Sequence, residues 1–366
     1  MDFVRRNAVY LSLALCALSA CKNEDDDDAD GNDKGEPAAQ SGSFEAKATK
    51  AVQTYVGAEL IKLNAAAIAL QKAAPEPDDN GWNDSDDAAA VKAMQKAWSD
   101  ARDAYERVEG SIAVLYGDLD KSTDARYNDF ISEDGPDDNL FDGEGVTGVH
   151  AIERILWSKW TPERVIDFEK KELGEDYVAA AFPQTREEAK QFKEELCERL
   201  VVDTKTMRDG IAGTTLNTTA AFWGMIGSME EQSEKTTLAA RGEDESRYAQ
   251  RTLADMRANL EGAKAVFAAF RPWIEATSKK APDIQDGLNA IGDAYTRVKG
   301  DALPEVPALF DPDQPSDEDL QTQYGMLWQL LGAETNPERA TDGKNSVVYT
   351  MGEAAKAMDI PVIDEE

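Results

Sequence analysis

The 366-residue sequence predicts an all-α protein made of two packed antiparallel helical bundles. Two long segments, 91–115 and 253–274, place an apolar residue at alternating three- and four-residue steps, which is the spacing of one face of a helix. Alternating patterns typical of β-strands are almost absent. Helices of this length bury one apolar stripe each most simply by packing against antiparallel neighbours, so we expect a helical-bundle fold.

Residues 1–20 are predicted to be a lipoprotein signal peptide. Two arginines precede an apolar run, 8–20, that is too short to cross a bilayer but suits a secretory signal. The run ends in Leu-Ser-Ala-Cys21, which resembles a bacterial lipobox, in which the cysteine becomes the lipidated first residue of the mature protein. We therefore expect lipidation of Cys21 and a place in the bacterial cell envelope, periplasmic or outer-membrane associated. An ordinary cleavage site beside an incidental cysteine is the alternative.

Residues 21–43 are predicted to form an acidic disordered tether. Positions 22–43 hold eight acids, two lysines and no aromatic residue, a composition that cannot bury enough apolar surface to offset the cost of ordering the backbone. Cys197 is then the single cysteine of the folded body, so we expect no intramolecular disulfide and favour a small buried thiol.

The helical domain is expected to span 44–300, with its two bundle halves divided near residue 180. A Thr185-x-x-Glu188 capping box opens one helix, and Pro272 should bend or end another. An extension of unassigned role, 301–366, is richer in proline and acids. Weaker helical patterns lie at 52–70, 192–207, 219–238, 284–298, 316–331 and 347–358.

The net charge and two loop segments exclude some classes of function and favour others. The net charge of −33, from 72 acidic and 39 basic side chains, argues against nucleic acid as a partner. The GxGxxG-like stretch 143–148 follows no predicted strand and contains an acid, so we expect no nucleotide site. The Asp/Gly-rich segment 117–148 is the one long loop expected between the predicted helices, and such loops often carry function.

The single histidine, His150, is the centre of the predicted functional site. Three residues' separation on a helix puts His150 and Glu153 on one face, where they can share a metal ion. Imidazole plus carboxylate suits iron(II), zinc, copper(II) or manganese, and further acids must complete the coordination shell. A zinc peptidase of the HExxH type needs two imidazoles and is excluded.

A polar stripe on the first long helix supplies two more candidate ligands. Arg102, Glu106 and Glu109 lie at i, i+4 and i+7, which puts them on one side of a helix. The alternative interpretation is a surface ion pair between Arg102 and Glu106, with His150 as a satisfied interior histidine.

Four ordered motifs follow one another in the middle of the chain. They are Arg102-x-x-Tyr105-Glu106-Arg107-Val108-Glu109, Gly117-Asp118-Leu119-Asp120, Asp124-Ala125-Arg126-Tyr127-Asn128-Asp129-Phe130 and Gly148-x-His150-x-x-Glu153. Together with a later block, from Gly242 to Pro272, they resemble the imelysin-like superfamily, and more closely its EfeO/EfeM branch. The resemblance covers roughly residues 45–300.

The resemblance implies two facing bundle halves with a metal site at the GxHxxE helix near their junction. It implies His150 and Glu153 as ligands, then Glu109 and Asp129, with Glu106 and Asp124 in reserve. It also implies a role in periplasmic ferrous iron uptake beside a membrane permease and a peroxidase partner.

We therefore expect a lipid-anchored periplasmic protein that captures a divalent metal ion for uptake, with iron(II) favoured over zinc or copper. Two alternatives stay open. One is a metal-dependent peptidase of the imelysin type, and the other is a non-catalytic surface lipoprotein that binds a protein or glycan partner.

Overall fold

The computed structural model describes residues 38–83, 85–336 and 346–361, and within these ranges the chain is helical without a β-strand. This confirms the all-α prediction. The predicted signal peptide and Cys21 lie outside the described residues, as does most of the predicted tether. The first helix begins at Ala38, inside the segment expected to be a tether.

The helices follow one another along the chain, mostly through short connections. In the first half they are α1 (Ala38–Ala73), α2 (Ala88–Glu106), α3 (Glu109–Leu115), α4 (Gly117–Asp124), α5 (Tyr127–Asp134), α6 (Gly148–Leu156), α7 (Glu163–Leu173) and α8 (Arg186–Gln191). In the second half they are α9 (Cys197–Gly210), α10 (Thr218–Ala239), α11 (Thr252–Thr277), α12 (Ala281–Thr296), α13 (Asp317–Leu320), α14 (Gln323–Thr335) and α15 (Val347–Ala357). Short 3₁₀ turns lie at Gly174–Asp176 and Ile211–Gly213, and a π-helical turn lies at Phe192–Leu196.

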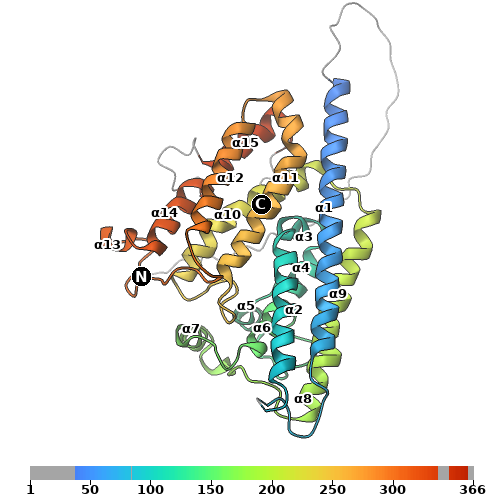
Figure 1. Cartoon of the computed structure of the whole chain (residues 1–366), viewed down its shortest axis with the longest axis vertical. Helices are drawn as coiled ribbons and strands as arrows, with labels where there is room; N and C mark the ends of the chain where they lie inside the picture. Colours follow the sequence, from blue (N-terminus) through green and yellow to red (C-terminus); the bar gives the residue numbers. More distant parts are fainter. Residues whose placement is uncertain (1–37, 84, 337–345, 362–366) are drawn as a thin grey trace, which may run out of the picture.

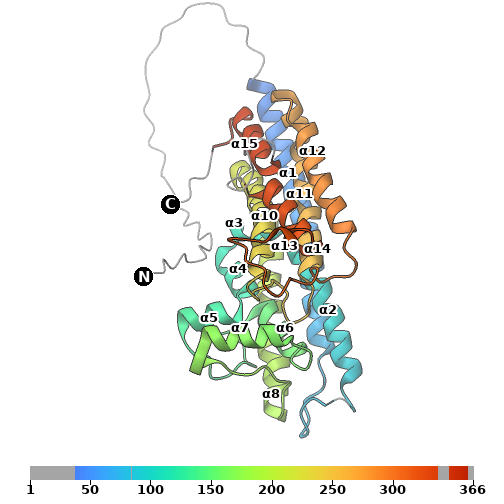
Figure 2. The ribbon, with the colours of Figure 1, turned by 90° about the vertical axis from the view of Figure 1, so that its left-hand side faces the viewer.

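The molecule is elongated, and α1 runs along its long axis (Figure 1). Helices α10, α11, α12, α14 and α15 gather beside the first half of α1, whereas α5 to α8 lie toward the opposite end (Figures 1 and 2). Helices α2 and α9 both pack against α1. The arrangement is a pair of helical bundles that share their longest helix.

Two large hydrophobic cores fill the two ends, and a smaller cluster of Ala239, Phe310, Tyr324 and Trp328 accompanies them. Apolar residues between positions 48 and 63 of α1 enter the first core with the helices from α10 onward, whereas Ala67 and Leu70 of the same helix enter the second core. Helix α2 changes core in the same way, since Trp98 belongs to the second core and Ala101 to the first. The division near residue 180 stays a prediction, because both cores draw on helices that precede it.

The predicted long helix over 91–115 is interrupted after Glu106. Two close helix contacts flank the break. A Cβ added to Gly262 of α11 would lie 2.2 Å from the Arg107 carbonyl oxygen, and one added to Gly110 would lie 2.2 Å from that of Gly224 in α10. At the break, α11 therefore packs directly against the backbone at Arg107, and α10 packs directly against the backbone at Gly110.

The segment 117–148 is only partly the loop that the sequence predicted. It contains α4 and α5, whose first turns carry Asp118, Asp120 and Asp129. Acids near a helix N-terminus interact favourably with its dipole, so the aspartates that suggested a loop instead stabilise two short helices.

Three other local predictions have clear outcomes. The capping box is confirmed, because the Thr185 side chain accepts from the Glu188 amide and the Glu188 carboxylate accepts from the Thr185 amide. Helix α11 does not end at Pro272 but continues to Thr277, with buried Trp273 and Ile274 packing its last turns. Cys197 is fully buried, and burial raises the pKa of its thiol.

The C-terminal segment completes the first core. Leu327 and Leu331 of α14 and Val347 and Met351 of α15 are buried against α10 to α12. Among the helices that the structure describes, none combines the length and apolar character needed to cross a bilayer.

Candidate metal centre

Helix α6 begins in direct contact with the end of α4. Gly148 has a φ of +85°, and a Cβ added there would lie 2.2 Å from the carbonyl oxygen of Thr123. The Thr147 hydroxyl donates to the Ser122 carbonyl at 3.0 Å. Only glycine tolerates both this backbone conformation and this approach, and the result is that His150 lies beside Asp124.

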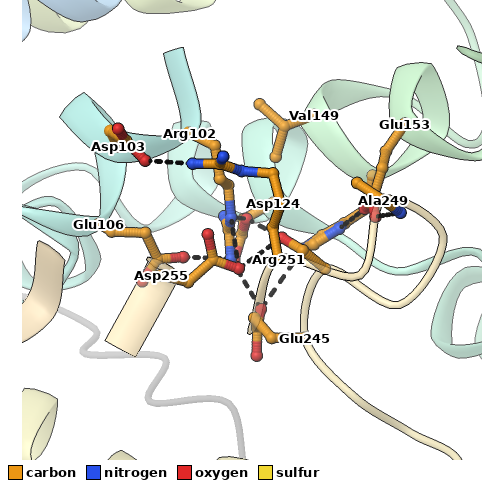
Figure 3. A network of polar contacts seen from close by, with 12 residues as sticks. Arg102, Asp103, Glu106, Asp124, Val149, Glu153, Glu245, Ala249, Arg251 and Asp255 are labelled. Carbon is orange, nitrogen blue, oxygen red and sulfur yellow. Dashed lines mark hydrogen bonds and ion pairs between the residues drawn. The ribbon is translucent and has the colours of Figure 1, made fainter. Parts of the chain in front are cut away.

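Three side chains from distant parts of the chain meet at this point. His150 Nε2 lies 3.4 Å from Asp124 Oδ1 and 3.4 Å from Glu245 Oε1. One ligand atom from each of the three residues lies within 4.8 Å of the other two, which is close enough for one metal ion to contact all three. Figure 3 shows Asp124 and Glu245 directed toward the same point from separate segments.

Glu153 contacts the opposite edge of the imidazole. His150 Nδ1 lies 2.9 Å from Glu153 Oε2. Glu153 Oε1 accepts from the backbone amides of Tyr248, at 3.0 Å, and Ala249, at 2.8 Å. Glu153 therefore fixes the ring with Nε2 facing the two carboxylates, and it holds the segment that carries Glu245.

Side chains of residues 244–248 hold that segment in place. The Ser246 hydroxyl donates to Asp255, and Arg247 Nη1 donates to the Asn128 side chain at 2.9 Å. The Tyr248 hydroxyl donates to Glu169. Because these contacts reach α5, α7 and α11, the position of Glu245 depends on several helices at once.

A buried arginine lies within the same group. Arg102 is inaccessible to solvent, and its guanidinium contacts Asp124 and Glu106 and lies 2.9 Å from Glu245 Oε1. Its Nε lies 3.8 Å from a carboxylate oxygen of Asp255. The Arg102–Glu106 pair predicted for the surface is thus present but buried (Figure 3).

The charges of the site favour ionised carboxylates and a protonated imidazole. Burial and the Arg102 guanidinium act to lower the pKa of His150, but Asp124 and Glu153 outweigh them and raise it to about 10. Burial alone would raise the pKa of Asp124, but Arg102 and His150 hold it below its usual range. Burial likewise opposes ionisation of Glu245, whose pKa is held well below its usual range chiefly by Arg126.

The other sequence-predicted ligands do not contact His150, although Glu106 reaches the group through Arg102. Glu106 and Glu109 both accept from the ammonium of Lys235, at 3.1 and 3.2 Å. The Asp129 carboxylate accepts from the side-chain nitrogen of Asn128, Nδ2, at 2.7 Å. Of the six residues predicted from the sequence, His150 and Asp124 belong to the three-ligand group, and Glu153 is joined to it through His150.

The donor set suits a divalent transition metal ion. One imidazole nitrogen and two carboxylate oxygens are ligands that iron(II), zinc and manganese all accept. His150 Nε2 is buried and makes no well-formed hydrogen bond with any described residue. Its proton faces one carboxylate oxygen of each acid at 3.4 Å, and a metal ion bound between the three atoms would take the place of that proton.

Glu245 is the residue that sequence reasoning missed. It belongs to the block Gly242–Tyr248, which carries a family resemblance but has no helical spacing relative to His150. Both this acidic block and the GxHxxE motif resemble the same family, so considering them together could have suggested Glu245 as a ligand. Periodicity within one helix cannot connect two segments so far apart in the chain.

The chain is similar to known proteins of one family. A family model described as "Peptidase_M75: Imelysin" matches residues 50–330. The "Iron uptake system component EfeO" of Yersinia pseudotuberculosis is 28% identical over 198 residues, which cover 54% of this chain and 42% of that protein. The match thus spans about two fifths of the length of that curated relative.

Staphylococcal relatives match over more of their length. An "Efem/EfeO family lipoprotein" of Staphylococcus haemolyticus is 26% identical over 318 residues, covering 84% of this chain and 91% of the relative. A protein of the same description from Staphylococcus aureus is 28% identical over 221 residues, covering 59% of this chain and 63% of the relative.

Proposed function

This chain belongs to the imelysin family and is of the EfeO/EfeM type, and from that premise we propose that it captures a divalent metal ion, with iron(II) favoured, for uptake into the cell. The metal is the cargo of the protein rather than a resident cofactor. His150, Asp124 and Glu245 would hold it, and zinc or copper are the other candidate ions.

The convergence of three ligand groups carries this proposal. Asp124 ends α4, His150 lies in the first turn of α6, and Glu245 lies between α10 and α11. Their ligand atoms lie within 4.8 Å of one another. An imidazole nitrogen and two carboxylate oxygens that meet from separate segments form a donor set that a divalent cation accepts, so the grouping supports a site for a cation.

The burial of the group supports capture from the side of Asp124. The side chain of Asp124 is 17% exposed, whereas those of His150 and Glu245 are 2% exposed. An ion would thus meet Asp124 first. The surrounding protein is strongly acidic, and a negative field raises the local concentration of cations and speeds their association.

The setting of the protein is proposed from its relatives. The printed names of the staphylococcal and Yersinia proteins include "lipoprotein" and "iron uptake system component". We infer attachment to the bacterial cell envelope through lipid on Cys21, and delivery of the ion to a membrane iron permease, with a peroxidase as a further partner.

Calorimetric titration of the purified protein tests the proposal. We expect one iron(II) ion per chain under anaerobic conditions, and also binding of zinc(II). His150→Ala, Asp124→Asn and Glu245→Gln should each weaken binding strongly, because each removes a group that contacts the ion. Asp118→Asn is the matched control, since Asp118 lies exposed on the same helix as Asp124.

Two outcomes would contradict the proposal. One is the absence of stoichiometric binding in the folded protein, and the other is binding that is unchanged in His150→Ala. Metal-dependent cleavage of an unfolded protein substrate, lost in His150→Ala, would instead support the peptidase alternative. Capture of a protein or glycan partner that does not depend on His150 would support the non-catalytic alternative.

A further inference from the structure

Arg102 shares its carboxylate partners with the candidate metal site. Its guanidinium contacts Asp124 Oδ1, and its Nη2 lies 2.9 Å from Glu245 Oε1. These are the same two oxygen atoms that lie 3.4 Å from His150 Nε2. The arginine side chain is completely buried, so water does not compete for these contacts.

From this sharing, and resting on the proposed function, we propose that Arg102 is an internal cation that competes with the metal ion for Asp124 and Glu245. In the metal-free protein the guanidinium contacts both carboxylates, beside Arg126 on Glu245 and His150 between the two. Binding of a metal ion then requires Arg102 to release at least one of the two shared oxygens. The arginine thereby lowers the affinity of the site and makes release easier.

The structure provides a second pair of partners for a displaced guanidinium. Glu106 already contacts Arg102, and Asp255 Oδ2 lies 3.8 Å from its Nε. Arg102 Nε and Asp255 Oδ1 are buried and make no well-formed hydrogen bond with any described residue. Asp255 lies beside the guanidinium in Figure 3, so a small movement toward it would pair Nε with this carboxylate while loosening the contacts with Asp124 and Glu245.

The competition has a defined thermodynamic consequence. When a site is open for only a fraction of the time, its apparent dissociation constant increases in inverse proportion to that fraction. Removing the arginine leaves the ligand oxygens open, and it also removes a positive charge that repels the metal ion. Both effects tighten metal binding.

Zinc(II) titration by calorimetry tests this role, with zinc chosen because it is not redox-active. We expect Arg102→Gln to bind zinc about tenfold more tightly than the unmodified protein, or more. Arg102→Lys retains a cation and should stay close to the unmodified protein. Arg126→Gln is the matched control, because Arg126 contacts the other oxygen of Glu245, Oε2, and its loss leaves Oε1 shared.

A second variant predicts the opposite change. Asp255→Asn removes the charge of the alternative partner of the displaced guanidinium but keeps an oxygen that can accept from Ser246, so it should weaken zinc binding. Ser246→Ala, which removes that hydrogen bond and leaves the charge of Asp255, is its control and should bind zinc more tightly than Asp255→Asn. Circular dichroism and thermal unfolding of each metal-free variant establish that it is folded. If Arg102→Gln fails to fold, the Asp255→Asn result still decides whether the inference holds.

The outcomes separate this inference from the proposed function. Unchanged or weaker zinc binding in folded Arg102→Gln, with binding still lost in His150→Ala, would overturn the role of Arg102 and leave the metal site intact. Equal tightening in Arg126→Gln would show a general charge effect and overturn it as well. If Arg102→Gln binds zinc and the unmodified protein does not, the result supports competition by Arg102. If neither Arg102→Gln nor the unmodified protein binds zinc, both proposals are overturned.

Discussion

At the scale of single residues, each member of the GxHxxE motif has a distinct physical role. Gly148 permits the close approach of α6 to α4, which no side chain would allow. His150 directs Nε2 toward Asp124 and Glu245. Glu153 contacts Nδ1 and two backbone amides, so it acts as a positioning residue for the imidazole and for Glu245.

Replacing Glu153 with glutamine should weaken metal binding by about tenfold to a hundredfold, as is typical when a residue that orients a metal-binding histidine is lost. An amide nitrogen facing Nδ1 donates rather than accepts, which favours the tautomer with its proton on Nε2, the atom that the metal needs. Calorimetry with zinc measures the change. Glu172→Gln, on an exposed part of α7, is the control, and equal affinity in both variants would contradict the positioning role.

Metal affinity should also depend on pH. Because the pKa of His150 is about 10 in the metal-free protein, Nε2 carries a proton at neutral pH that the metal ion must displace. Affinity should therefore increase as the pH rises, by about tenfold per pH unit, at every pH below that pKa. Titrations in buffers with different ionisation enthalpies measure the released proton, and an affinity independent of pH would contradict the assignment.

At the scale of secondary-structure elements, the short helices decide the geometry of the site. Helix α4 ends at Asp124, and α6 begins at Gly148 against the last turn of α4. The indole of Trp98 in α2 donates to the Val149 carbonyl at 2.8 Å, which ties the start of α6 to a long helix. The two helices are therefore held in place by a neighbour that belongs to the bundle framework.

Gly148→Ala should destabilise the protein by about 2–4 kcal/mol, because the variant combines a strained positive φ with a clash against backbone. Gly117→Ala is the matched control at the start of α4, where an added Cβ meets no atom within 4 Å. Urea unfolding of both variants measures the difference. A Gly148→Ala protein as stable as the control would mean that the contact between α4 and α6 relaxes freely.

At the scale of the whole molecule, the site lies where the two hydrophobic cores meet. Helix α2 passes from the second core at Trp98 to the first core at Ala101, and Arg102 follows immediately. A buried polar cluster at this boundary separates the apolar interiors of the two bundles. The net charge of −33 adds a repulsion that acts across the entire molecule.

The metal-free protein should become more stable as salt concentration rises. Screening of like charges strengthens as the Debye length falls from roughly 30 Å at 0.01 M to about 8 Å at 0.15 M salt. Thermal unfolding in increasing sodium chloride should give a melting temperature that rises by several degrees. The same increase in choline chloride would identify screening as the cause, whereas a fall in melting temperature would contradict it.

The sequence by itself determined the helical class and the long apolar stripes and singled out His150 as the centre of a candidate site, because these depend on spacing within single segments or on a single residue. The apolar positions of 91–115 and the capping box at Thr185 are examples. Local spacing also suggested Glu153, but not which nitrogen of the imidazole it would contact.

Only the tertiary structure decided which acids join His150. Glu106 ends α2 and Glu109 begins α3, so the predicted continuous helix face is broken between them. Both accept from Lys235, which α10 brings to them, and Glu106 also pairs with Arg102. Glu245 reaches the site because Glu153 binds the backbone of residues 248–249. Convergence of distant segments depends on how helices pack and where a chain turns between them, and residue spacing along one helix contains no information about either.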